Sequence, residues 1–136
     1  EGVVDPTTSA QIGMRTPNES HGFNVIHADE MFRLGIDATV DRIREVVGGR
    51  AAYLTVDIDF LDPAYAPGTG TPVVGGPTTW QARQILFGLR GLDVVGADLV
   101  EVAPAYDPSG QITALAGATL AHDELHLLAE ARDRRR

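Results

Sequence analysis

Two aspartates at the end of an apolar stretch are the residues of this chain best placed to do chemistry. Asp57 and Asp59 end the segment 53–59, which we predict to be a strand. Residues two apart in a strand point to the same face, with Cα atoms roughly 6.5–7 Å apart, so the two carboxylates would lie side by side. Like charges this close raise each other's pKa, and a bound cation removes that cost. Because carboxylate oxygens suit Mg²⁺, Mn²⁺ or Ca²⁺, we predict that Asp57 and Asp59 are metal ligands rather than turn or cap residues.

The segment after these aspartates is a loop rich in proline and glycine, spanning residues 60–77. Asp62 precedes Pro63 in it, and we interpret Asp62 either as a turn-forming residue or as a partner that orients a metal ligand. The hydroxyls of Thr69 and Thr71 could cap the backbone of a tight turn. Glu101 follows a predicted strand, where a buried carboxylate would need a partner such as a salt bridge.

The bulk composition limits the classes of partner. The chain has 136 residues, 43% of them apolar and 22% charged, which fits one globular α/β domain. Its net charge of −8 argues against nucleic acid or an anionic membrane as partner, and it mildly favours a cationic substrate over a merely solvated acidic surface. There is no cysteine and no apolar run of membrane-spanning length, so we expect a cytoplasmic protein. The start at Glu1, without Met or a signal pattern, suggests a cut within a longer protein.

Apolar periodicity predicts strands that alternate with helices, and therefore βαβ units with a parallel sheet. We predict strands at residues 11–14, 23–27, 53–59 and 92–100. We predict one helix that includes residues 36–47 and stops at Gly48, a second that begins near Thr78 or Thr79, and a third over residues 113–132. We expect the third helix to bury Ala114, Leu115, Ala118, Leu125 and Leu128. Ligands of such folds bind at the carboxyl ends of strands, where Asp57, Asp59 and Glu101 all fall.

A long motif gives this chain a family resemblance. Residues 57–76 read D-I-D-F-L-D-P-A-Y-A-P-G-T-G-T-P-V-V-G-G and resemble the second metal motif of the ureohydrolases, the superfamily of arginases and agmatinases. The resemblance continues through residues 91–107 and 112–116, and residues 11–16 and 21–26 look like the corresponding agmatinase segments. It is closer to agmatinase than to arginase. The fold that it implies is the C-terminal part of a three-layer α-β-α arginase-like domain with a mostly parallel sheet.

The resemblance also implies roles for particular residues. Asp57 and Asp59 would help to hold a pair of Mn²⁺ ions, Glu101 would bind the substrate guanidinium, and Thr71 would lie close to the substrate. The implied reaction is the Mn²⁺-dependent hydrolysis of a small guanidino substrate to urea and an amine, with agmatine giving putrescine. Guanidinobutyrase, guanidinopropionase and proclavaminate amidinohydrolase activities are alternatives. The family tendency is a homo-oligomer, either a trimer or a hexamer.

The chain departs from the family in one large respect. Complete ureohydrolases carry G-G-D-H and D-A-H-x-D motifs, which supply the other metal ligands, and a catalytic histidine, and none of these occurs here. We therefore interpret residues 1–136 as the C-terminal half of a single domain, without a catalytic acid or base of its own, and expect it to be inactive alone. A non-catalytic remnant and a binding module for a cationic ligand are the other interpretations.

The remaining candidates are interpreted as structural or solvent-facing. His122 and His126 lie four apart on the last predicted helix, but the glutamate between them is misplaced for the known zinc motifs, so we expect both to face solvent. We expect solvent-facing positions for His21 and His27, a structural role for Asp98, and packing or loop-anchoring roles for Trp80 and Tyr106.

Overall fold

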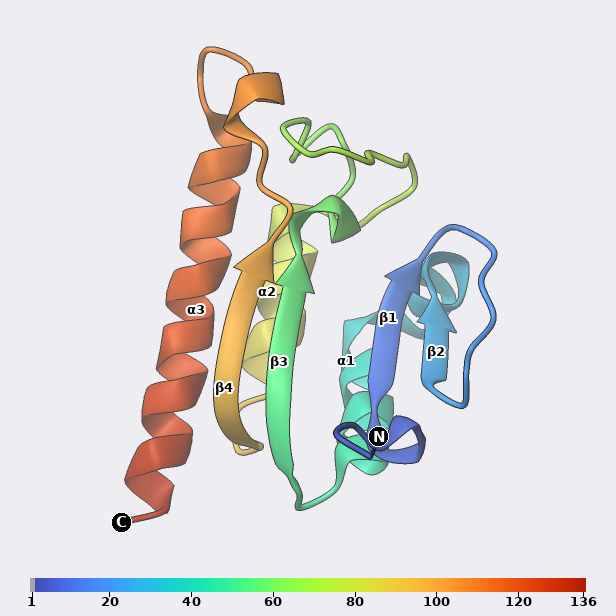
Figure 1. Cartoon of the computed structure of the whole chain (residues 1–136), viewed down its shortest axis with the longest axis vertical. Helices are drawn as coiled ribbons and strands as arrows, with labels where there is room; N and C mark the ends of the chain where they lie inside the picture. The colour runs from blue at the N-terminus through green and yellow to red at the C-terminus, as the bar shows by residue number, and fades with distance from the viewer. Residues whose placement is uncertain (1) are drawn as a thin grey trace.

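The computed structural model describes residues 2–136 as short parallel strands with helices packed along them (Figure 1). In chain order, 3-10 turns included, the elements are η1 (Pro6–Thr8), β1 (Ala10–Met14), β2 (Asn24–His27), α1 (Ala28–Val47), β3 (Ala51–Asp57), η2 (Ile58–Phe60), α2 (Thr79–Gly88), β4 (Asp93–Val100), η3 (Pro104–Tyr106) and α3 (Ile112–Arg134). β1 pairs with β2 and β3 pairs with β4, both in parallel, which confirms the α/β prediction. Glu1, where the interpretation of a cut end began, lies outside the described residues. No helix of residues 2–136 is both long and apolar enough to cross a membrane.

The strands form two separate two-stranded sheets rather than the single sheet that we predicted. All four arrows point the same way in Figure 1, but β1 and β3 are not paired with each other. A cavity of about 710 Å³ lies between them, and apolar side chains of the helices, including Ile43, Ile85 and Leu120, contribute to its wall. The alternation of strands and helices predicts parallel direction, but it does not determine which strands become neighbours.

Local sequence signals account for the ends of the helices. Thr78 caps α2 as predicted, because its side chain accepts from Gln81 N–H while the Gln81 side chain accepts from Thr78 N–H. Gly48 ends α1 with a positive φ of 62°, a conformation that glycine adopts without a steric penalty. α1 extends beyond the predicted residues 36–47 to Ala28, and it is kinked at Gly35, whose φ of 79° is not helical.

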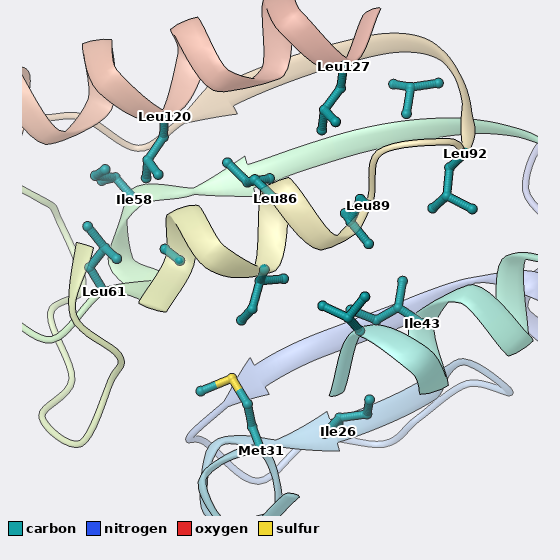
Figure 2. Close-up of a cluster of buried hydrophobic side chains, with 14 of the residues drawn as sticks. Ile26, Met31, Ile43, Ile58, Leu61, Leu86, Leu89, Leu92, Leu120 and Leu127 are labelled. Atoms are coloured by element: carbon teal, nitrogen blue, oxygen red, sulfur yellow. The ribbon is translucent and has the colours of Figure 1, made fainter. Parts of the chain in front are cut away.

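The buried face of α3 differs from the one that we predicted. Leu115 and Leu125 are 67% and 63% exposed, and Ala118 is exposed, whereas Leu120 and Leu127 are fully buried. Figure 2 shows Leu120 pointing toward Ile58 within the cluster that also contains Leu86 of α2 and Leu89, the residue that follows α2. Because α3 carries apolar residues on more than one face, periodicity alone did not select the face that packs against α2 and β4. Ala114 and Leu128, also expected to point inward, are partly buried.

Two neighbouring acidic residues of α3 are buried in very different surroundings. Asp123 accepts two hydrogen bonds from the Arg83 guanidinium of α2, at 2.7 and 3.2 Å. Glu124 is only 3% exposed, and its Oε1 atom has no hydrogen-bond partner among the described residues. Burial, followed by the negative charge of Asp98, raises the pKa of Glu124 to about 7. Ionised Glu124 therefore destabilises the folded chain at neutral pH.

We expect Glu124→Gln to stabilise the chain at pH 8 and to have little effect at pH 5. The pKa of Glu124 is higher in the folded state than its ordinary value of 4.5, so its contribution to stability is lost as pH rises from 4.5 through 7. The gain at pH 8 should be about 1–3 kcal/mol, the usual cost of a buried unsatisfied polar group. Urea unfolding at both pH values measures it, with the exposed Asp133→Asn as control. An equal effect of Glu124→Gln at pH 5 and pH 8 would contradict this assignment.

Candidate metal and substrate site

The two aspartates lie where β3 ends, but only one of them belongs to the strand. β3 ends at Asp57, and the chain turns at once into η2, which contains Asp59. The carboxylate of Asp57 caps this turn by accepting the backbone N–H of Asp59 at 3.0 Å. The prediction of a strand through Asp59 was therefore wrong, because the side chain of Asp57 offers the backbone a turn instead of a continued ladder. Both aspartates nevertheless line the cavity between β1 and β3.

The register of the β3–β4 pair brings Glu101 to the same place. Asp57 pairs with Val100, the last residue of β4, and Glu101 follows directly. Glu101 has φ of 66°, a left-handed conformation that costs a non-glycine residue about 1–3 kcal/mol and is found most often at functional sites. Glu101 is exposed and forms no ion pair among the described residues, so the salt bridge considered as the alternative to substrate binding is not formed there, and the predicted role in substrate binding stays a prediction.

Negative charge accumulates at this edge of the sheet. Burial raises the pKa of Asp57, and the charges of Asp59 and Glu101 raise it further, which together outweigh the hydrogen bond from Asp59 N–H. A cation beside Asp57 and Asp59 would reverse this effect, so the donor set suits a hard divalent ion. Within residues 2–136, however, no three histidine, cysteine or acidic side chains are grouped to hold a metal. The two aspartates can therefore supply only part of a ligand set.

Thr71 comes to the same site through the proline- and glycine-rich loop. Its hydroxyl donates to Oδ2 of Asp59 at 2.9 Å. Thr69 behaves differently: it is 3% exposed, and its hydroxyl has no partner among the described residues. Neither hydroxyl therefore caps local backbone, which was one of the two interpretations, and the predicted position of Thr71 close to the substrate stays a prediction. Thr69 instead joins the loop to the segment after Glu101 through a backbone bridge with Val102.

Asp62 has the structural role that one of our two interpretations gave it. Its Oδ1 accepts from Ala64 N–H at 2.9 Å, and its Oδ2 accepts from Gly75 and Gly76 N–H at 2.7 and 3.2 Å. These backbone hydrogen bonds hold the pKa of Asp62 below its usual range. Asp62 therefore closes the loop on itself and fixes the path of the chain between Asp59 and Thr71.

Arg15 is a site residue to which the sequence analysis gave no role. Its guanidinium, at the end of β1, donates to the carbonyls of Val73 at 3.0 Å, Phe60 at 2.9 Å and Gly13 at 3.2 Å, and also to the carbonyl of Asp59. One cation thus holds both ends of the loop and the turn that carries Asp59. The available signal was its position at the carboxyl end of a predicted strand, the same signal that identified Asp57.

The other candidates lie outside this site. His122 and His126 are exposed, as expected, and their rings contact each other edge to face with centroids 4.6 Å apart. Trp80 and Tyr106 are 63% and 69% exposed, so neither packs into the core of residues 2–136, and the alternative of loop anchoring stays a prediction. Asp98 accepts the Tyr53 hydroxyl at 3.1 Å. His21 and His27 are exposed, as predicted.

Comparison with known proteins shows the family to which the chain that carries this site belongs. The sequence profile of the arginase family matches residues 1–126. The chain belongs to the arginase family. An agmatinase of Proteus mirabilis is 56% identical over 130 residues, which cover 95% of this chain and 42% of that protein. A guanidinopropionase of Pseudomonas aeruginosa is 49% identical over 140 residues, 96% of this chain and 44% of that protein.

A solved structure shows that this arginase-family chain keeps the arrangement of a longer relative. The crystal structure of a hypothetical agmatinase from Burkholderia thailandensis superposes with a TM-score of 0.91 at 53% identity, covering 98% of this chain and 42% of that one. The chain therefore spans less than half the length of these relatives. The likeness confirms the prediction of an arginase-like α/β fold.

We expect Arg15→Met to destabilise the chain by about 1.5–3 kcal/mol, the usual contribution of hydrogen bonds to a charged group. Thermal unfolding measures the loss, and hydrogen exchange of the amides of residues 59–76 should accelerate. Arg33→Met is the matched control, because Arg33 and its partner Asp29 are both 71% exposed and such pairs contribute about 0.2–1 kcal/mol. Unchanged exchange in Arg15→Met would show that the loop does not depend on this cation.

Proposed function

We propose that the complete protein hydrolyses a guanidino substrate to urea and an amine, and that agmatine, giving putrescine, is the favoured substrate. The observation that carries the proposal is the convergence of Asp57, Asp59 and Glu101 at the carboxyl ends of β3 and β4, with no ion pair among the described residues. Similarity to agmatinases over nearly the whole chain supports the choice of substrate. Similarity to a guanidinopropionase makes 3-guanidinopropionate the second candidate.

The chain's own residues divide the work. Asp57 and Asp59 would hold part of a Mn²⁺ pair, which when bound lowers the pKa of water so that it becomes a nucleophile near neutral pH. Glu101, exposed beside the loop, can accept two parallel N–H bonds from the planar guanidinium and so orient its carbon. Thr71 fixes Asp59 through its hydroxyl, and we propose that it lies close to the bound substrate.

The remaining parts of the site would come from outside residues 1–136. We propose that these residues form the C-terminal half of one domain in a cytoplasmic homo-oligomer, a trimer or a hexamer. The other half would supply the remaining metal ligands and the histidine that protonates the leaving amine. Guanidinobutyrase and proclavaminate amidinohydrolase activities stay as alternatives within the same chemistry, and a remnant or a binding module as non-catalytic ones.

A urea-release assay with Mn²⁺ tests the proposal. We expect no urea from the 136-residue chain, because its described residues do not complete a metal site. The complete protein should release urea from agmatine faster than from 3-guanidinopropionate, 4-guanidinobutyrate or arginine. Urea from the short chain would contradict its predicted inactivity, and urea from arginine alone would contradict the substrate assignment. No urea from any substrate with the complete, Mn²⁺-loaded protein would favour a remnant.

In the complete protein we expect Glu101→Gln to lower kcat/KM for agmatine about 10²–10³-fold, as for loss of one strong electrostatic contact to a transition state. The bound Mn²⁺ measured by mass spectrometry should stay the same. Glu130→Gln is the control, because Glu130 is an acidic residue of α3 that pairs with Arg90 and Arg134. Loss of Mn²⁺ in Glu101→Gln would instead make Glu101 a metal ligand.

A further inference from the structure

A second cavity, with no lining residue in common with the first, lies between β4 and α3. Its volume is about 470 Å³, and its wall is mostly apolar, with Ala97, Leu99, Ala118 and Leu125 among the lining residues. Two carboxylates interrupt this apolar wall, Asp98 from β4 and Glu124 from α3. This lining matches a ligand that combines an aliphatic part with a positive charge.

Neither carboxylate has a full set of partners. Oε1 of Glu124 and Oδ1 of Asp98 are both enclosed and lack hydrogen-bond partners within residues 2–136. Oδ2 of Asp98 accepts a hydrogen bond from the hydroxyl of Tyr53. A tyrosine hydroxyl has only one hydrogen to donate, so Tyr53 cannot also donate to Oδ1 of Asp98. Arg83, the basic residue that reaches α3 nearby, is already bound to Asp123 through two hydrogen bonds. A 97%-buried carboxyl aimed into a cavity with no cation beside it is costly unless something else supplies the donors.

The lining selects the class of cation. Hard divalent ions need six or more oxygen ligands, and apolar side chains cannot provide them. A guanidinium or an ammonium on an aliphatic stem fits better, since it brings N–H donors for the carboxylates and its methylenes match the apolar lining at Leu99 and Leu125. Arginine and lysine side chains have this form.

The unpaired edge of β4 indicates which kind of segment carries such a side chain. Within the described residues β4 has β3 as its strand partner on one side, and its other edge is unpaired. Apolar side chains are exposed on β4 and α3, with Val95 53% and Leu115 67% accessible. In the Burkholderia thailandensis structure the same elements keep their arrangement and make up 42% of the chain, so more than half of that chain is available to cover surfaces such as these.

We propose that the cavity between β4 and α3 binds an arginine or lysine side chain, carried by a strand that pairs with the free edge of β4. The strand belongs to the part of the same protein that this chain does not include. The cation donates to Asp98 and Glu124, and the aliphatic stem fills the apolar wall. Ionised Glu124 thereby helps to hold the two halves of the domain together.

N-Butylguanidinium is the probe for the test, with neutral N-butylurea as its matched control. Amide shifts of the 136-residue chain are followed by two-dimensional NMR at pH 8. We expect saturable shifts at residues 97–99 and 121–125 with the cation and none with the urea. The dissociation constant should rise at least fivefold in Glu124→Gln and in Asp98→Asn, and should be unchanged in Glu130→Gln. The two variants are independent, so one that fails to fold does not leave the proposal without a test.

Several outcomes would overturn the proposal. Equal shifts with N-butylurea, or unchanged affinity in both Glu124→Gln and Asp98→Asn, would exclude a cation site. A dimer that light scattering detects in the wild type and not in Glu124→Gln would make a second copy the occupant. In the complete protein the cavity should be filled, so binding of the probe there with the same affinity would refute the assigned strand. None of these results depends on urea release, so the proposed function stands or falls separately.

Discussion

Three carboxylates lie at one end of a parallel strand pair, and the rest of the structure must hold them there against their mutual repulsion. The register that sets Asp57 opposite Val100 places Glu101 beside it, and the turn after Asp57 adds Asp59. Burial and like charge raise the pKa of Asp57, so the arrangement is unfavourable without a cation. It persists because the strand register and the turn after Asp57 hold the backbone of all three residues at this end of the pair.

The loop that follows Asp59 is held by hydrogen bonds rather than by regular structure. Asp62 binds the loop to itself through the amides of Ala64, Gly75 and Gly76. Arg15 binds it to β1 by donating to backbone carbonyls on both sides of it. Polar anchors of this kind set the position of Thr71 relative to Asp59 more closely than apolar contacts could, because hydrogen bonds are directional. Site geometry and loop rigidity are therefore one problem in this chain.

The two cavities show that the β3–β4 pair is open along both of its edges. One cavity separates it from β1, and the other lies between β4 and α3. Both cavities leave apolar side chains uncovered within residues 2–136, as expected of a segment that covers less than half of its relatives. The carboxylates of the first cavity serve the proposed chemistry, whereas those of the second lie among apolar walls and suit a side chain from the rest of the domain.

The sequence by itself determined the local features: the cap at Thr78, the stop at Gly48, and the position of Asp57 and Glu101 at strand ends. These depend on neighbours within a few residues, whose preferences are readable from residue type. Only the tertiary structure decided that α3 buries Leu120 rather than Leu125, that the strands form two sheets, and that Arg15 joins the site. Each of these depends on packing and hydrogen bonding between segments distant in the chain, where several arrangements satisfy the same local pattern.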